Sequence, residues 1–213
     1  MIKAIILDFD GVIAESVHVK TEAFAEMYCS YGEDIVKKVV AHHLRNGGVS
    51  RFEKFSTYHS VFLGVDLNEK QIKELSACFS DLVMEKAIKA PYVPGAIEFI
   101  KNNYIKYDLY ISSGTPENKM KEVAKRRNIS SYFRDIYGSP EKKTEHVRKI
   151  INKHKYSSSE VVFIGDAMSD VQAAKENSIC FIARVDGDES PLKDEKNNIP
   201  DLISIEEKLK VLL

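Results

Sequence analysis

The sequence predicts an α/β protein in which an all-helical segment interrupts a parallel sheet after its first strand. Short apolar runs, of the kind shown by strands buried on both faces, alternate with helical patterns along most of the chain. Strands that alternate with helices are typical of a parallel sheet covered by helices on both faces. Between residues 16 and about 90 the pattern is helical only, so this stretch is expected to form a separate unit.

Five strands and four helices are expected in the sheet-forming part. The strands are 3–7, 108–111, 161–164 and 179–183, with a weaker one at 135–137, and the helices are 96–103, 117–127, 144–155 and 170–176. Pro94-Gly95 and Pro116 stand just before the first two of these helices, where proline is favoured. We assign this Rossmann-like core to residues 1–15 and 91–213, with an exposed polar loop at 186–198.

Residues 16–90 are expected to form a helical cap domain. Amphipathic patterns predict helices at 18–31, 33–44, 51–62 and 68–89, and the sequence "RNGGVSR" at 45–51 predicts a loop among them. Both connections between this segment and the core are short. Short connections favour a compact cap that is hinged on the core.

Composition disfavours several classes of partner and location. The 213 residues include 31 basic and 32 acidic side chains, a net charge of −1, so we expect no nucleic-acid and no membrane partner. No apolar stretch reaches the roughly 18 residues that span a bilayer, and the N-terminal apolar run is shorter than a secretory signal. Cys29, Cys78 and Cys180 are far apart and odd in number, which indicates reduced thiols and a cytoplasmic location. We expect a monomer or a small homo-oligomer.

Acidic and small hydroxyl residues directly follow three of the predicted strands. The sequence is "DFDG" after the first strand, "SSGT" after the second along the chain, and "GDAMSD" after the strand at 161–164. In an open parallel sheet, ligands bind outside the carboxyl ends of the strands. Asp8, Asp10, Asp166 and Asp170 are therefore expected to gather at one edge, where they would repel one another unless a cation lay among them.

Mg²⁺ suits such a carboxylate group, because it takes oxygen ligands and keeps positions for water and phosphate oxygens. A carboxylate beside the metal can attack phosphorus and form an aspartyl-phosphate. A lysine and nearby hydroxyl or N–H donors would hold the other phosphate oxygens. Asp10, two residues after Asp8, could protonate the leaving oxygen and then deprotonate the attacking water. The local alternatives are helix capping by these aspartates and a turn at the serines.

The motifs "LDFDGVI", "ISSGTP", "KKTEH" and "FIGDAMSD" resemble, in order, the four motifs of the haloacid-dehalogenase-like (HAD) hydrolase superfamily. The 16–90 insert resembles the helical cap of its C1 branch, which includes phosphatases and enzymes of the β-phosphoglucomutase type. The resemblance implies Asp8 as nucleophile and Asp10 as general acid/base. It also implies Mg²⁺ held by the Asp8 side chain, the Asp10 carbonyl and Asp166, with support from Asp170.

The resemblance leaves two phosphate-binding positions ambiguous. We choose Ser113 over Ser112, with the Gly114 N–H beside it, because the family pattern is an apolar strand followed by Ser or Thr and often Gly. We choose Lys143 over Lys142 from its spacing to the following helix.

The cap sequence offers weaker signals. Arg45, Arg51 and Lys54 surround the Gly-Gly turn and could meet an anionic or polyol part of the leaving group; the alternative is a solvated loop. Ser16, at the hinge, could touch phosphate. His42 and His43 lack the further ligands of a zinc site.

The leading prediction is a Mg²⁺-dependent phosphatase acting on a small phosphorylated metabolite. A phosphomutase on the same scaffold is the alternative, since an aspartyl-phosphate can be passed to a sugar hydroxyl instead of water. A dehalogenase is disfavoured because Asp10 is present. A non-catalytic phospho-receiver module is less favoured, because it needs neither Asp10 nor a helical insert of this size.

Overall fold

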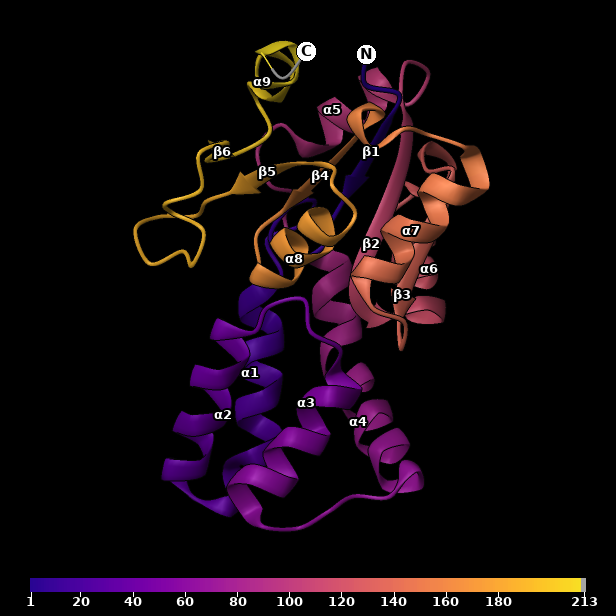
Figure 1. The fold of residues 1–213 in the computed structure, drawn as a ribbon. Helices are drawn as coiled ribbons and strands as arrows, with labels where there is room; N and C mark the ends of the chain where they lie inside the picture. Colours follow the sequence, from indigo (N-terminus) through magenta and orange to yellow (C-terminus); the bar gives the residue numbers. More distant parts are fainter. Residues whose placement is uncertain (212–213) are drawn as a thin grey trace.

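The computed structural model describes residues 1–211 and contains a parallel sheet of six strands, with the order β3-β2-β1-β4-β5-β6 (Figure 1). The strands are β1 (Ala4–Leu7), β2 (Asp108–Pro116), β3 (Asp135–Ser139), β4 (Val161–Gly165), β5 (Cys180–Arg184) and β6 (Asn198–Ile199). All four residues of β1 are buried at the centre of the sheet, between β2 and β4. The predicted α/β class with a parallel sheet is confirmed.

Side chains alternate between the two faces of this sheet, as the two-residue period of a strand requires. Ile5 and Leu7 belong to one apolar cluster, whereas Ala4 and Ile6 belong to the cluster on the other face. Helices α5 (Ala96–Asn103), α6 (Glu117–Arg126), α7 (Lys143–His154), α8 (Met168–Glu176) and α9 (Ile205–Val211) complete the core. A strand with both faces covered has no polar face, which explains why the sequence of β1 is an unbroken apolar run.

Two elements of this core were not predicted from the sequence. β6 has only two residues, and its first residue, Asn198, falls at the end of the predicted loop. α9 has seven residues, of which Ile205 and Leu209 are buried. Neither element is long enough to show a clear periodic pattern. β2 is also longer than predicted, since it continues through the two serines to Pro116.

The insert between β1 and β2 carries α1 (Val17–Tyr28), α2 (Glu33–Arg45), α3 (Arg51–Thr57) and α4 (Glu69–Lys89), with short helices η1 (Cys29–Tyr31) and η2 (Tyr58–Leu63). These helices lie together below the sheet in Figure 1. They share an apolar cluster of their own, centred on Phe24, Phe55, Tyr58 and Phe79. The insert is therefore helical, as predicted; the exact domain boundaries at residues 15/16 and 90/91 stay a prediction.

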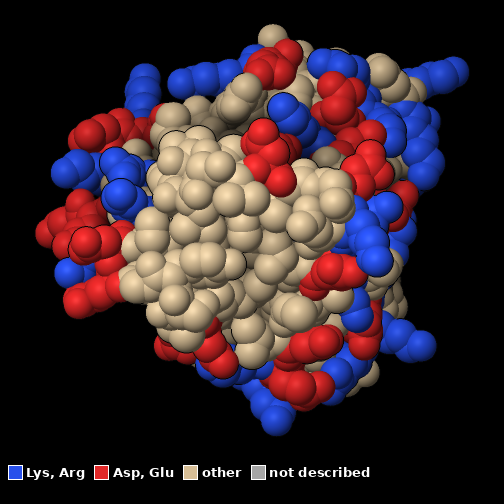
Figure 2. Space-filling view, turned by 90° about the horizontal axis from the view of Figure 1, so that it is seen from below, with Lys and Arg blue, Asp and Glu red and all other residues tan. Residues whose placement is uncertain are grey.

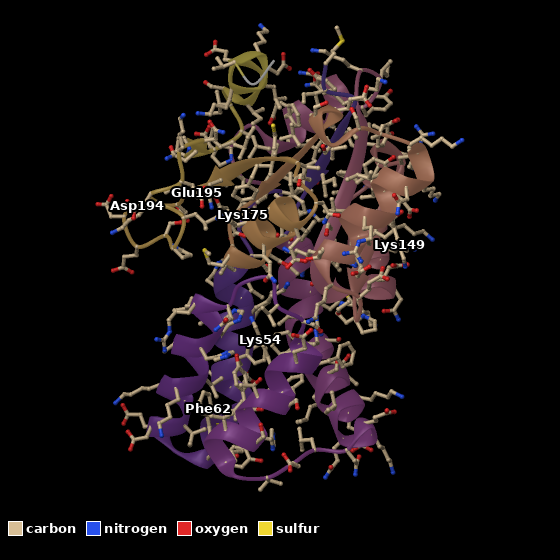
Figure 3. All side chains as sticks on the ribbon, viewed as in Figure 1. Lys54, Phe62, Lys149, Lys175, Asp194 and Glu195 are labelled. Carbon is tan, nitrogen blue, oxygen red and sulfur yellow. The ribbon has the colours of Figure 1, made fainter. Side chains whose placement is uncertain are left out.

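The predicted helix at 51–62 has two parts, because the α-helical hydrogen-bond pattern ends at Thr57 and a π-helical turn follows. This turn lies at the far end of the cap, near Phe62 in Figure 3. Figure 2 looks at the molecule from that side and shows a broad face whose centre has no Lys, Arg, Asp or Glu. Within residues 1–211, no helix is long and apolar enough to cross a membrane.

Candidate active site

The carboxyl ends of β1 and β4 bring three aspartates together. Asp8 follows β1, Asp166 follows β4, and Asp170 lies in the first turn of α8. Because Leu7 of β1 is in register with Ile164 of β4, the residues that follow the two strands meet at one edge. One carboxylate oxygen from each of the three aspartates lies within 4.8 Å of the other two.

Gly11 allows the loop after β1 to close on this cluster. Its φ of +74° is in the left-handed region, which favours glycine. A Cβ atom at this position would lie 2.0 Å from Oδ2 of Asp166. A side chain there would therefore push the loop away from the acidic cluster.

Lys143, the first residue of α7, is buried against the cluster. Its Nζ donates to Oδ2 of Asp8 at 2.7 Å and to Oδ1 of Asp170 at 2.5 Å. Burial lowers the pKa of Lys143, but the attraction of Asp170 and Asp8 outweighs it and the pKa is raised, so this side chain stays an ammonium. Lys142 is exposed, and Lys143 is thus the lysine that the structure brings to Asp8.

One lysine does not balance the charge of the three carboxylates. Burial, and then the charges of Asp8 and Asp170, raise the pKa of Asp166 well above its ordinary value. Within residues 1–211, no hydrogen bond or ion pair engages the Asp166 carboxylate. A half-buried carboxylate without a partner beside two buried ones fits a divalent cation, and an all-oxygen donor set suits a hard cation such as Mg²⁺, Ca²⁺ or Mn²⁺.

Asp10 lies beside the cluster and is held by two residues of the insert. The Ser16 hydroxyl donates to its Oδ1 at 2.5 Å, and Lys20 forms an ion pair with its Oδ2. The Lys20 Nζ also donates to Oγ1 of Thr115 at 2.9 Å, so it joins the insert to β2. Burial raises the pKa of Asp10, but Lys20 and Ser16 outweigh burial, and the pKa is lowered.

Lys20 was not among the site residues predicted from the sequence. Ser16 and Lys20 are four residues apart and so lie on one face at the start of α1. This spacing, directly after the acidic motif, is the sequence signal from which Lys20 could have been predicted as a site residue. For Ser16, contact with phosphate was one interpretation of the sequence; in the structure its hydroxyl donates to Asp10.

The two candidate serines of β2 have different partners. The Ser112 hydroxyl is hydrogen-bonded to Nδ1 of His146 in α7 at 2.9 Å. The Ser113 hydroxyl accepts from the backbone N–H of Thr115 at 3.1 Å, and Gly114 lines the cavity described below. Ser112 is therefore engaged within the core, while Ser113 and Gly114 lie in the later part of β2, where its register with β3 shifts. Their contact with phosphate stays a prediction.

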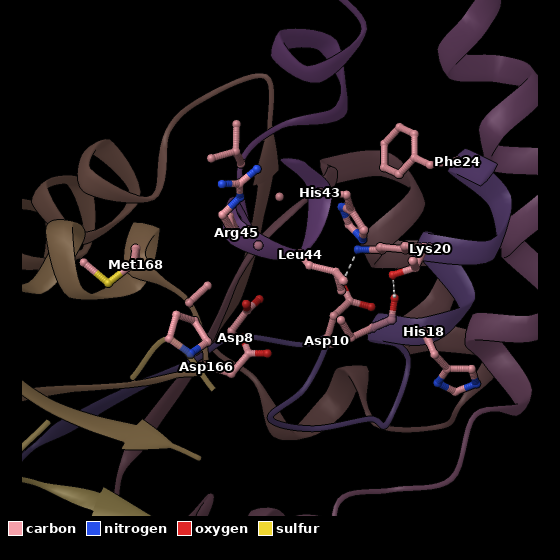
Figure 4. A pocket seen from close by; sticks show the side chains of 18 of the residues that line it. Asp8, Asp10, His18, Lys20, Phe24, His43, Leu44, Arg45, Asp166 and Met168 are labelled. Atoms are coloured by element: carbon pink, nitrogen blue, oxygen red, sulfur yellow. Dashed lines mark hydrogen bonds and ion pairs between the residues drawn. The ribbon is translucent and has the colours of Figure 1, made fainter. Parts of the chain in front are cut away.

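A cavity of about 540 Å³ separates the acidic cluster from the cap (Figure 4). Its core wall includes Asp8, Asp10, Gly114, Asp166 and Arg184, and its cap wall includes Lys20, His43, Arg45, Arg51 and Lys54. This size is ordinary for a small-molecule site.

The Gly47-Gly48 turn closes one side of the cavity by direct contact with the core. The Ser169 hydroxyl donates to the Gly47 carbonyl at 3.0 Å. Gly48 has a φ of +75°, and a Cβ atom there would lie 2.4 Å from Oγ of Ser169 and 2.7 Å from Nζ of Lys143. The cap is thus seated on the core in this structure.

The three cap residues singled out from the sequence are placed differently from one another. Arg45 is exposed at the cavity mouth, and its Nε donates to the Ala41 carbonyl at 3.2 Å. Arg51 and Lys54 are buried, with 4% and 2% of their surfaces exposed, and they belong to α3. A solvated loop, the alternative interpretation, is therefore wrong for Arg51 and Lys54. The Arg51 guanidinium donates to Ser80 and lies over the Phe79 ring.

Together, a parallel sheet with an acidic cluster at its carboxyl edge and a helical insert after its first strand define the capped HAD-like class of proteins. A family model described as haloacid dehalogenase-like hydrolase matches residues 2–177. The chain belongs to this family of hydrolases, as its motifs predicted.

Sequence relatives and solved structures agree with that assignment. The chain is 27% identical over 189 residues to a phosphorylated carbohydrates phosphatase of Thermotoga maritima, covering 83% of this chain and 82% of the relative. It is 23% identical over 181 residues to a phosphoglycolate phosphatase of Vibrio parahaemolyticus, covering 82% of this chain and 79% of the relative. A β-phosphoglucomutase structure from Clostridium difficile superposes with a TM-score of 0.79 at 18% identity, covering 99% of this chain and 98% of that one, which shows the shared fold.

Proposed function

We propose that this protein is a Mg²⁺-dependent phosphatase that hydrolyses a small phosphorylated metabolite through a phosphorylated Asp8. The observation that carries the proposal is the meeting of Asp8, Asp166 and Asp170 within 4.8 Å of one another, with Asp8 and Asp166 lining a capped cavity. The similarity to two phosphatases that act on phosphorylated small molecules supports the substrate class. The enclosing cap disfavours a large substrate such as a phosphorylated protein.

Asp8 is the proposed nucleophile. Its carboxylate lies at the cavity floor, where Oδ2 accepts from the Lys143 ammonium and Oδ1 accepts from the Phe9 backbone N–H at 2.6 Å. Both contacts orient the carboxylate whose oxygen would attack phosphorus. Asp8, Asp166 and the backbone carbonyl of Asp10 would hold Mg²⁺, with Asp170 in support. When bound, the metal neutralises negative charge on the phosphoryl group. Lys143, Ser113 and the Gly114 N–H would bind the remaining phosphate oxygens.

Asp10 is the proposed general acid and base. Lys20 and Ser16 hold its carboxylate beside the cavity. The negative charge of an arriving phosphate raises the pKa of a neighbouring carboxyl group, which favours the protonated form needed to donate to the leaving oxygen. After the leaving group departs, the ionised form accepts a proton from the water that attacks the phosphorylated Asp8.

Phosphate release from p-nitrophenyl phosphate tests this proposal. We expect turnover that requires Mg²⁺ and is lost in Asp8→Asn and Asp10→Asn. Stoichiometric labelling without turnover would instead indicate a phospho-receiver. Conversion of one sugar phosphate into its isomer, dependent on a bisphosphate activator, would indicate a phosphomutase. The cytoplasmic location and the oligomeric state stay predictions.

A further inference from the structure

Arg184, the last residue of β5, is a buried cation on the core wall of the cavity, and only 6% of its side chain is exposed. Its Nη2 and Nη1 donate to the two carboxylate oxygens of Glu15 at 2.8 and 3.2 Å. Two parallel bonds of this kind fix the orientation of a carboxylate as well as its charge. The Nε atom donates to the Pro200 carbonyl at 3.0 Å, which anchors the guanidinium to the core. The pair therefore joins Glu15 firmly to the sheet.

Glu15 lies where the chain passes from the turn after β1 into α1. That turn closes through two hydrogen bonds onto the Phe9 carbonyl, both at 2.9 Å, and Ser16 is the N-cap residue of α1. The Glu15 N–H donates to the Pro91 carbonyl at 2.9 Å, so the two connections between cap and core are paired here. Arg184 therefore ties β5 to the point at which α1 leaves the core.

The start of α1 carries both groups that hold Asp10. The Ser16 hydroxyl and the Lys20 ammonium bind different oxygens of the Asp10 carboxylate. Whether these two side chains reach Asp10 depends on where α1 begins, and Glu15 lies two residues before the first residue of that helix. The position of Glu15 thus decides how the Asp10 carboxylate is held.

Arg184 braces the same segment at a second point. Its Nη1 lies 3.4 Å from the Gly11 carbonyl, so one guanidinium contacts the chain both directly after Asp10 and at Glu15. Asp186 also lies 3.4 Å from Nη1, but its side chain is 76% exposed and solvent weakens the attraction. Glu15 is therefore the principal counter-ion of the buried arginine.

We infer that Arg184 is a positioning residue for Asp10 and acts through Glu15. By fixing the start of α1, the ion pair sets where that helix presents the two side chains that orient the Asp10 carboxyl group toward the leaving oxygen. The inference rests on the proposed function, in which Asp10 is the general acid. Without Arg184, the Glu15 carboxylate loses its cation and the start of α1 can shift. A misplacement of about 1 Å can cost roughly 100-fold in rate, and general acid catalysis contributes about 10²- to 10⁴-fold.

Leaving groups of different basicity test the inference, because protonation by a general acid matters most for a strongly basic leaving oxygen. Phenyl phosphate and p-nitrophenyl phosphate are close in size and charge, but phenolate is the more basic leaving group. Their kcat/KM values report the steps up to departure of the leaving group, and so exclude the later role of Asp10 as a base. We expect Arg184→Met to lower kcat/KM for phenyl phosphate by roughly 10- to 100-fold more than for p-nitrophenyl phosphate. Loss of folded protein, or of cap closure alone, would lower both values equally.

Three further variants show whether the effect passes through the ion pair. Glu15→Gln removes the charge of the partner but keeps its shape, and should change the ratio of the two kcat/KM values in the same direction. Because the two residues act as one pair, the double variant Glu15→Gln/Arg184→Met should change the ratio no more than the larger single effect. Arg184→Lys should restore part of the ratio, since an ammonium keeps the charge but lacks the paired donors.

Arg134→Met is the matched control. Arg134 forms an ion pair with Asp108 at 2.6 Å, at the start of β2 and away from the cavity, so its loss should leave the ratio unchanged. A ratio that stays at the wild-type value in Arg184→Met or in Glu15→Gln would overturn the inference, and so would an equal change in Arg134→Met. If Arg184→Met does not fold, the ratio in Glu15→Gln decides alone. Absence of Mg²⁺-dependent p-nitrophenyl phosphate turnover in the wild type would instead overturn the proposed function.

Discussion

Replacing Gly48 by alanine should unseat the cap from the core. Its φ of +75° makes any L side chain strained by roughly 1 kcal/mol. In addition, the new Cβ would meet Oγ of Ser169 at 2.4 Å and Nζ of Lys143 at 2.7 Å. Lys143 cannot move freely, because Asp8 and Asp170 hold its ammonium. Overpacking of this kind costs about 1–3 kcal/mol, which corresponds to a loss of roughly 5- to 150-fold in kcat/KM if the closed cap is the active form.

Gly64→Ala is the matched control. Gly64 also lies in the cap with a positive φ, +68°, but a Cβ atom there would meet nothing within 4 Å. Both variants should therefore lose a similar amount of unfolding free energy from backbone strain, whereas only Gly48→Ala should lose activity. Thermal unfolding and steady-state kinetics with p-nitrophenyl phosphate measure the two effects. Equal activity of the two variants would refute the argument that the Gly47-Gly48 turn seats the cap.

Further predictions concern charge and metal. Lys20→Met should lower kcat by about 10-fold or more, because Asp10 loses its cationic partner, and should move the pH–rate profile; an unchanged profile would contradict that role. Mg²⁺ should raise the melting temperature of the wild type, since it binds the folded state, and this shift should disappear in Asp166→Asn. Burial, and then the charges of Lys20 and Lys143, lower the pKa of Lys54 from 10.5 to about 7. Between these pH values the unfolded chain therefore keeps a proton on Lys54 that the folded protein has lost. The unfolding free energy of the wild type should therefore rise with pH from 7 to 10 relative to Lys54→Met, by at most roughly 1.4 kcal/mol per pH unit, in chemical denaturation. A parallel pH dependence of the two proteins would show that folding does not lower the pKa of Lys54.

Much of the core could be predicted because its signals are local. β1 is apolar at every position since both of its faces are covered, and α5 has the predicted bounds of Ala96 and Asn103. The acidic residues could be placed together from one rule, namely that parallel strands end at the same edge. β6 and α9 were not predicted because each is too short to show a clear periodic pattern in the sequence.

The cap side of the site could be predicted far less well. Arg51 and Lys54 fall in the predicted helix at 51–62 and lie in α3, but their burial was not predicted. Their burial depends on how α3 packs against α1, α2 and α4, and no pattern within the segment itself reports that packing. The pairing of Lys20 with Asp10 and Thr115 depends likewise on where α1 crosses the end of β2. Contacts between an inserted unit and its host are long-range, so only the structure shows them.

The most direct test of the central claim is to locate the phosphoryl group after an acid quench. The enzyme would be mixed with Mg²⁺ and a rapidly hydrolysed phosphate ester, quenched within one turnover, digested, and fragmented by mass spectrometry. We predict phosphorylation at Asp8, and none in Asp8→Asn. Turnover with the phosphoryl group on another residue, such as Ser113, or with no covalent intermediate at any quench time, would contradict the account.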